Sequence, residues 1–271
     1  IAVDVPGCLT IEESGKKARA KGRCFLIDFQ TRANDLYIEA IKRVHNGDIG
    51  AFAFGESSYH AGNPWADQVA AMKSDPKNPE NRLRAWGLDR VLSGDIITEQ
   101  NIHTLDVASW ILDQPPIQAW GMCGHKVRDD GGDVHDSFQA TFEYPGSVGI
   151  SFSSRQFEGY GSSGGIKNRM YGADGVLEAE YGGAVLIRGK KKFDGGQTGN
   201  IFTDGVKTNI AAFHRDITGG RFDNPTVECS VRSNLVTILG RTAAYKKEAV
   251  RWDDLLKNKE KLEFNFSGMK D

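Results

Sequence analysis

The sequence lacks the features that mark membrane-spanning, disulfide-stabilised and nucleic-acid-binding proteins. Its apolar runs are far shorter than the roughly twenty residues that cross a bilayer. The four cysteines, Cys8, Cys24, Cys123 and Cys229, form no C-x-x-C pair, which argues against a zinc site or a disulfide framework and favours free buried thiols. A net charge of −2 over 271 residues provides no basic field for nucleic acid. We therefore expect a globular protein with neither a membrane nor a nucleic acid as its partner.

The beginning of the chain also lacks a targeting signal. Residues 1–7 contain no basic segment followed by an apolar run, so no secretory signal peptide is visible. The chain starts at Ile1 rather than at a methionine, and we expect the true N-terminus to lie upstream. A cytoplasmic location is expected, and a periplasmic one stays open.

Residues 1–34 have the pattern of one helix followed by one strand. Thr10 can cap a helix that runs to Gly22, with acidic residues in its first turn and basic residues in its last, as the helix dipole favours. The continuous apolar run of residues 24–29 predicts a buried parallel strand. Because one αβ unit cannot close a doubly wound sheet, we expect residues 1–34 to be the last part of a larger α/β domain.

Residues 35–271 alternate between helical and strand patterns. Helical spacing predicts a helix over 35–46 that ends at Asn46-Gly47, and a strand comes next, over 50–60. Residues 61–92 carry Trp65 and Trp86 among many polar residues, which is typical of a long ordered excursion beside a binding site.

The second half of the chain is dominated by strand patterns. Turn residues at 144–146 and 182–183 predict hairpins. Strands are predicted over 117–127, 135–144, 147–154, 167–172, 176–181 and 184–188, and helices over 206–219 and 227–248. We expect an α+β fold, with an open, predominantly antiparallel sheet covered by helices on one face.

The glycine cluster at residues 159–164 matches the dinucleotide-binding pattern G-x-G-x-x-G. That motif requires its last glycine to open a helix whose N-terminus holds the pyrophosphate. The next residues, 165–172, favour a strand instead. We therefore interpret the cluster as a mobile hairpin loop, not as a nucleotide site.

Residues 94–113 predict a helix that lines a polar cleft. At 100° per residue, Glu99, His103, Asp106 and Trp110 share one 60° sector. The apolar residues Ile102, Leu105, Ala108 and Leu112 occupy a separate face that can pack in the core.

Three interpretations of the polar stripe compete. It can be a solvated helix face. It can carry a general acid/base, His103, whose pKa the carboxylates one turn away would raise. It can also bind a divalent metal, but no second histidine lies nearby in the sequence. Acid/base chemistry is favoured over metal binding, and we expect no metal site here.

The segment from Ser93 to Trp110 resembles the central helix of the glucose-fructose oxidoreductase/inositol dehydrogenase (Gfo/Idh/MocA) family. That family has an Asp-x-Gly-x-His-x-x-Asp motif whose histidine takes the substrate proton. Glu99 stands at the first aspartate, His103 at the histidine and Asp106 at the second aspartate. Glutamate in place of the first aspartate keeps the charge and lengthens the arm.

The resemblance extends over nearly the whole chain. Residues 1–7 resemble the segment immediately after the family's Glu-Lys-Pro motif, and residues 28–32 resemble the last strand of its nucleotide-binding domain and the turn into the second domain. By this comparison residues 1–34 are a remnant of the dinucleotide-binding domain, and residues 35–271 are the substrate-binding and oligomerisation domain. The phosphate loop, five Rossmann strands and the catalytic lysine would then be missing, and the chain alone would be inactive.

The resemblance implies a full-length oxidoreductase that uses NAD or NADP to oxidise a hydroxyl of a sugar or cyclitol. His103 would accept the hydroxyl proton, while Glu99 and Asp106 would orient the ring. Further candidates are Arg32, Arg84 and Trp86 for substrate contacts and Gln30 for the cofactor. The resemblance also implies a homodimer or tetramer formed through the sheet face. Two alternatives stay open: an NAD-dependent redox-cycling glycosidase or lyase, and a non-catalytic carbohydrate-binding or assembly module.

Overall fold

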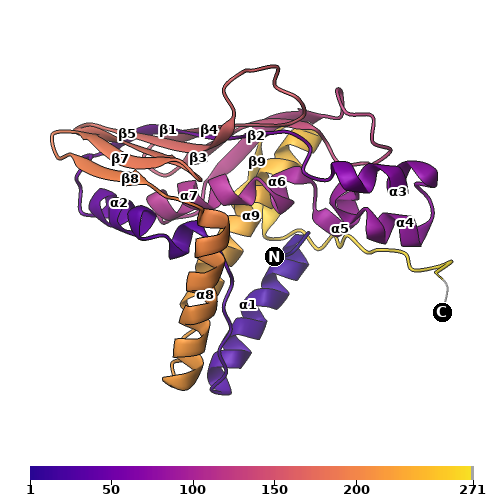
Figure 1. The fold of residues 1–271 in the computed structure, drawn as a ribbon, viewed down its shortest axis with the longest axis horizontal. Coiled ribbons are helices and arrows are strands. Elements are labelled where there is room, and N and C mark those ends of the chain that lie inside the picture. Colours follow the sequence, from indigo (N-terminus) through magenta and orange to yellow (C-terminus); the bar gives the residue numbers. More distant parts are fainter. Residues whose placement is uncertain (270–271) are drawn as a thin grey trace.

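The computed structural model describes residues 1–269 and contains one sheet of nine strands. Figure 1 shows the sheet as one layer, with the helices gathered beneath it and two helices projecting away from the body. The strands are β1 Phe52–Ala61, β2 Gln118–Gly124, β3 Ser137–Tyr144, β4 Val148–Gln156, β5 Gly165–Gly172, β6 Gly175–Glu180, β7 Ala184–Gly189, β8 Phe193–Gln197 and β9 Val250–Arg251. The predicted open, mostly antiparallel sheet is confirmed.

The helices account for most of the remaining residues. The α-helices are α1 Val5–Ala20, α2 Asp35–His45, α3 Val69–Ser74, α4 Pro79–Arg84, α5 Arg90–Ser93, α6 Ile96–Glu99, α7 Ile102–Leu112, α8 Ile201–Thr218, α9 Pro225–Lys246 and α10 Trp252–Leu255. Short 3-10 turns are η1 Thr31–Ala33, η2 Ala66–Gln68 and η3 Trp86–Leu88. None of the helices within residues 1–269 combines the length and the apolar character that a membrane crossing requires.

The strand order is β8-β7-β6-β5-β1-β4-β3-β2-β9. The hairpins predicted at residues 144–146 and 182–183 are confirmed, since they join the antiparallel neighbours β3 and β4, and β6 and β7. β1 lies at the centre of the sheet, parallel to β4 and antiparallel to β5. The β1–β4 pair is therefore the one parallel pair in this otherwise antiparallel sheet of residues 1–269.

The glycine cluster at 159–164 leads from β4 into strand β5, as predicted, and not into a helix. The prediction of a hairpin at this point is wrong. β4 and β5 are not neighbours, because β1 lies between them. The glycine segment is therefore a crossover connection.

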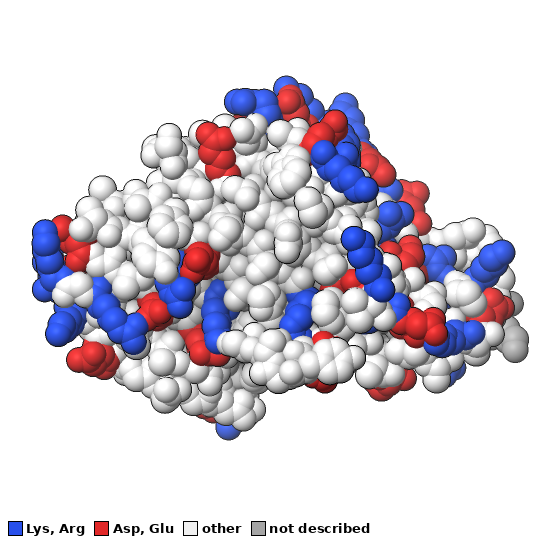
Figure 2. Space-filling model, turned by 90° about the horizontal axis from the view of Figure 1, so that it is seen from above, with Lys and Arg blue, Asp and Glu red and all other residues white. Residues whose placement is uncertain are grey.

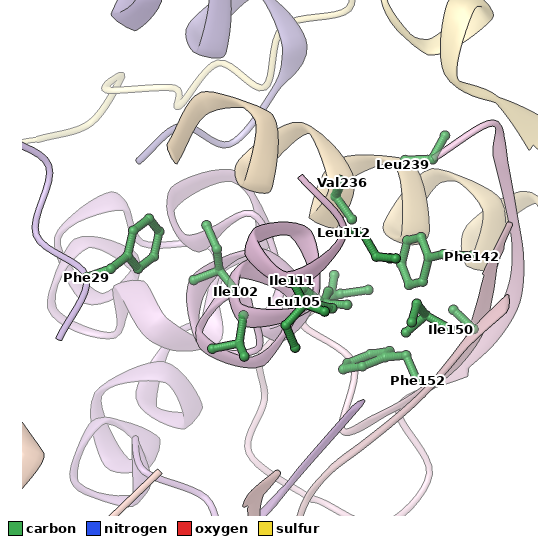
Figure 3. Packing of buried hydrophobic residues seen from close by; sticks show 14 of the residues in the cluster. Phe29, Ile102, Leu105, Ile111, Leu112, Phe142, Ile150, Phe152, Val236 and Leu239 are labelled. Atoms are coloured by element: carbon green, nitrogen blue, oxygen red, sulfur yellow. The ribbon is translucent and has the colours of Figure 1, made fainter. Parts of the chain in front are cut away.

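The core lies between the sheet and helices α7 and α9. Figure 3 shows Leu105, Ile111 and Leu112 of α7 packed toward Phe142, Ile150 and Phe152 of the sheet, with Val236 and Leu239 of α9 nearby. Both helices bury residues on almost all sides, polar ones included. They are central elements of the core, not surface helices with one buried stripe.

A buried hydrogen-bond network fixes α7 to the sheet. The side-chain amide of Asn168 on β5 donates to the Ser57 hydroxyl at 2.8 Å and to the Thr104 backbone carbonyl at 2.9 Å. The Thr104 hydroxyl donates to the Asn168 side-chain oxygen at 3.0 Å. Because each polar group is satisfied, the network holds α7 in one position against β1 and β5.

The predicted N-terminal helix is confirmed, but it begins at Val5 and is capped by Asp4, whose carboxylate accepts the Gly7 N–H at 2.7 Å. The predicted strand over residues 24–29 is not formed. The N–H groups of Phe25 and Ile27 donate instead to the side chains of Asn224 and Thr226 at the start of α9. A run of this kind needs flanking strands to pair with, and residues 1–269 place none beside it.

Figure 2 views the sheet from its uncovered side, which we call the open face. Charged side chains gather toward the edges of this view, while uncharged residues occupy its middle. A ladder of charges crosses β1, β5 and β6, where Arg169 binds Glu56 at 2.9 Å and Glu178 at 3.0 Å. Phe54, Trp120 and Met122 are each nearly half exposed. The open face therefore combines polar rows with partly exposed apolar side chains.

Candidate active site

The continuous helix predicted over residues 94–113 is interrupted. α6 ends at Glu99 and α7 begins at Ile102. At the junction the Asn101 N–H donates to the Ile96 carbonyl and the His103 N–H to the Gln100 carbonyl, so the regular four-residue ladder is lost. Glu99 and His103 therefore lie on two helices that meet at a widened turn.

Glu99 and His103 nevertheless face the same cleft, which has a volume of about 370 Å³. Its wall also includes Asp28 and Phe29 from the segment before η1 and Trp86 from η3. The remaining lining residues are Ile1, Ala2, Val3, Leu92, Ser93, Thr98 and Ile102. The N-terminal residues, the excursion at 61–92 and the α6–α7 junction thus converge on one site.

His103 is the most enclosed titratable group of the cleft. Its ring lies edge-on to Phe29, with centroids 6.2 Å apart, and 5.6 Å from the ring of Tyr181. Burial lowers the pKa of His103, and the opposing effect of Asp106 is smaller. The expectation of a raised pKa is therefore wrong, because burial of the imidazole outweighs the attraction of Asp106. A neutral imidazole can accept a proton at neutral pH.

Asp106 does not line the cleft. Its carboxylate is fully buried and accepts from the Arg32 guanidinium at 2.9 Å and from the Ser233 hydroxyl at 2.7 Å. Arg32 also lies over the Trp110 ring, 4.8 Å from its centroid. Asp106 therefore forms an ion pair with Arg32 on the Trp110 side of α7, and its carboxylate does not reach the cleft.

Glu99 carries a buried carboxyl group. Burial raises its pKa to about 7. The indole N–H of Trp65 faces the carboxylate and offsets part of this rise, but without hydrogen-bond geometry. Glu99 Oε2 and His103 Nδ1 both lack a hydrogen-bond partner among residues 1–269. Unpaired buried polar atoms are costly, so these two atoms are suited to binding a polar ligand.

The raised pKa of Glu99 predicts a pH-dependent stability. A carboxyl group whose folded pKa is raised contributes stability that is complete below the unfolded value of 4.5 and is lost as pH rises toward 7. Relative to Glu99→Gln, the free energy of unfolding of the native protein should therefore fall by about 2 to 3 kcal/mol across this window. Urea denaturation at pH 4.5 and pH 7.5 measures the difference.

The matched control for this experiment is Glu39→Gln, at a half-exposed carboxylate on α2. Its stability profile should run parallel to that of the native protein. A parallel profile for Glu99→Gln as well would show that the Glu99 carboxyl group titrates as it does in water.

The other residues predicted to contact the substrate or the cofactor lie in different places in the structure. Trp86 lines the cleft and stacks at a tilt on Trp65, with centroids 4.7 Å apart. Arg84 is exposed on α4 and does not line the cleft. Gln30 accepts a hydrogen bond from the Tyr181 hydroxyl at 3.2 Å and packs on Gly205 of α8. Only Trp86 of these three is placed to touch a ligand in the cleft.

Three residues of the site had no role in the sequence-based prediction. Asp28 lines the cleft, and burial raises its pKa. Trp65 backs Glu99, and Tyr181 from the end of β6 flanks His103. The sequence did indicate Trp65, since it is an aromatic residue within the polar segment 61–92. No local pattern indicated Tyr181, because only the folded sheet brings it to α7.

The described residues offer neither the phosphate loop of a dinucleotide site nor a cluster of metal ligands. Within residues 1–269 no group of three or more His, Cys, Asp or Glu side chains is arranged to hold a metal. The glycine cluster at 159–164 enters a strand, so it offers no helix N-terminus to a pyrophosphate. The cleft itself is large enough for a small polyol or a ring.

Comparison with solved structures gives consistent matches to oxidoreductases. An aldose-aldose oxidoreductase from Caulobacter crescentus, complexed with glycerol, is 20% identical with a TM-score of 0.67, over 92% of this chain and 69% of that chain. A myo-inositol 2-dehydrogenase from Lactobacillus plantarum is 18% identical with a TM-score of 0.64, over 89% and 69%. An oxidoreductase from Agrobacterium radiobacter, in complex with NAD+, L-tartaric acid and magnesium, is 13% identical with a TM-score of 0.66, over 92% and 70%.

At these identities the structural likenesses establish the fold. No curated protein matches the sequence. A family model, in contrast, matches more than half of the chain: the GFO/IDH/MocA C-terminal domain aligns with residues 37–178. The chain therefore belongs to the GFO/IDH/MocA family, of which it contains the C-terminal domain.

Proposed function

We propose that this chain forms the substrate-binding part of an NAD- or NADP-dependent oxidoreductase that oxidises a hydroxyl group of a sugar or cyclitol. The observation that carries the proposal is the pair of unpartnered buried atoms, His103 Nδ1 and Glu99 Oε2, in one cleft. The oxidoreductases of similar fold, with glycerol, myo-inositol or L-tartaric acid in their names or complexes, support a polyhydroxylated substrate.

The neutral imidazole of His103 is the proton acceptor in this proposal. Oxidation of a carbinol carbon releases a proton from the hydroxyl group, and nicotinamide, when bound, supplies the hydride acceptor. His103 is oriented by the edge of Phe29 and by Tyr181. Its lowered pKa keeps the base unprotonated at neutral pH.

Glu99 and Trp86 orient the substrate. The Glu99 carboxylate can accept a hydrogen bond from a neighbouring hydroxyl group, which would satisfy its unpartnered oxygen. The Trp86 indole offers an apolar face on which a sugar ring can stack. Asp106 and Arg32 do not contact the substrate in this proposal; their ion pair holds α7 in place.

The nucleotide is proposed to bind to a domain that precedes Ile1, of which residues 1–34 form the end. Residues 1–3 lie on the wall of the cleft, so a domain that precedes them would lie next to the cleft. α8 supports the same proposal, since Phe202, Ile210 and Ile217 are 61%, 65% and 49% exposed on one side of a projecting helix. Apolar groups exposed at this spacing favour a covering domain.

A homodimer or tetramer formed through the open face remains part of the proposal. Phe54 and Trp120 provide apolar contacts there, and the ladder at Arg169 provides complementary charges. A second copy of the chain, turned by a twofold axis, could use both.

The experiment that tests the proposed function follows the cofactor in the protein expressed from its complete reading frame. With NAD or NADP and a panel of polyols, we expect absorbance of the reduced cofactor at 340 nm to accumulate with one class of substrate. Glycoside cleavage without net reduction would establish a redox-cycling glycosidase instead. Binding of sugar without turnover of any kind would leave a carbohydrate-binding module as the function.

A further inference from the structure

A second pocket opens on the uncovered side of the sheet. It has a volume of about 540 Å³ and lies where β1, β2 and β4 end and β3 begins. Ser137, Arg155 and His60 are register neighbours across β3, β4 and β1 and form its base. The other lining residues are Met122, Cys123, Gly124, Lys126, Phe138, Gln139, Ser153, Ser154, Phe157 and Lys247. His103, in contrast, lies on α7 beneath the sheet.

The lining is cationic and contains no carboxylate. Lys126, Arg155 and Lys247 all border the pocket, with no Asp or Glu among the lining residues. None of the ion pairs formed within residues 1–269 involves these three side chains. Elsewhere on the same face, Arg169 and Arg188 are paired with glutamates. The pocket is thus a local concentration of uncompensated positive charge.

Arg155 is held in place by the backbone. Its Nη1 donates to the carbonyl groups of Ala61 at 3.2 Å and Phe157 at 2.5 Å. The buried carboxylate of Asp136 is already occupied, because it accepts the backbone N–H groups of residues 126, 127 and 128. The guanidinium therefore has a fixed position and no carboxylate from the lining to neutralise it.

His60 lies in the electrostatic field of these cations. Its Nε2 lies 3.0 Å from the Ser153 hydroxyl. Burial lowers the pKa of His60, and the charges of Arg155 and Lys167 lower it further. At neutral pH the ring is therefore an uncharged hydrogen-bonding group between cations.

We propose that this pocket binds a small organic anion through a carboxylate or phosphate group. The anionic oxygens would lie among Lys126, Arg155 and Lys247, whose positive charges have no carboxylate partner. The carbon skeleton would pack on Met122 and Phe157, and the hydroxyl of Ser153 and the amide of Gln139 would bind polar substituents. The volume admits a ligand of the size of a sugar acid or a sugar phosphate.

Calorimetric titration and NMR test the proposal with two probes, inorganic phosphate and glucuronate. Ionic strength is kept constant with sodium chloride, so that general screening does not change. We expect Lys126→Gln combined with Lys247→Gln to weaken binding of at least one probe tenfold or more. We also expect the pKa of His60 to rise when the probe is saturating, because nearby negative charge favours the imidazolium.

The matched control is Arg188→Gln, which removes an exposed cation of the same face outside the pocket. It should bind the probes as the native protein does. The probe that binds more tightly identifies the anionic group, and either result supports the proposal. Equal affinity in the double variant and the control, or a His60 pKa that does not move, would overturn it. Binding of polyglutamate without binding of either small anion would also overturn it, in favour of a macromolecular partner.

Discussion

Replacement of His103 by Asn is expected to lower kcat for polyol oxidation by roughly 10²- to 10⁴-fold, the usual contribution of a general base. The substitution removes the only imidazole that faces the cleft among residues 1–269. Asparagine keeps a planar, polar side chain and adds no bulk to the cleft, so KM should change far less than kcat. Steady-state kinetics on the protein expressed from its complete reading frame measure both constants.

The control for this experiment is His45→Gln, on the surface of α2, where the imidazole contacts the backbone carbonyls of Trp110 and Ile111. Its kcat should equal that of the native enzyme. The remaining activity of His103→Asn should rise with pH, as hydroxide replaces the missing base. Full turnover at neutral pH in the His103 variant would refute the assignment of His103 as proton acceptor.

Replacement of Arg32 by Met should be strongly destabilising, at about 3 to 5 kcal/mol. It leaves the Asp106 carboxylate fully buried, and the Ser233 hydroxyl is then its one side-chain partner among residues 1–269. An unpaired buried charge costs more than the ion pair itself contributes, since desolvation is no longer offset. Urea denaturation gives the free energy of unfolding.

Two further variants separate the ion pair from simple packing. Arg32→Met combined with Asp106→Leu removes both charges and should recover most of the lost stability. Arg43→Met breaks a partly exposed pair with Glu39 on α2 and should cost less than about 1 kcal/mol. If the double variant is as unstable as Arg32→Met alone, packing around Trp110, and not charge, explains the loss.

Local patterns in the sequence predicted most individual elements. Alternation located β1 and the strands from β2 to β7, and the turns at residues 144–146 and 182–183 identified two hairpins correctly. Two strands were missed for physical reasons. β9 has only two residues, and β8 contains Gly195 and Gly196, which weaken any strand propensity.

Long-range arrangement was not predictable from these patterns. The position of β1 between β4 and β5 depends on pairing across the chain, which no local signal encodes. Asp106 was placed on the cleft wall because helical periodicity cannot show that Arg32 and Ser233, far away in the sequence, bind its carboxylate. The break at Gln100 and Asn101 rotates Glu99 relative to His103, which an ideal helical wheel cannot represent.

The central position of β1 also governs how the chain can fold. Glu56 must find Ser151 on one side and Arg169 on the other before the sheet is continuous, while β3 and β4 can form their hairpin early. Pairings between segments so distant in the chain carry a high loop-closure entropy and slow the folding of a domain. During synthesis β1 would leave the ribosome long before either neighbour exists. Its exposed edges would then be the segment most in need of a chaperone until β5 is complete.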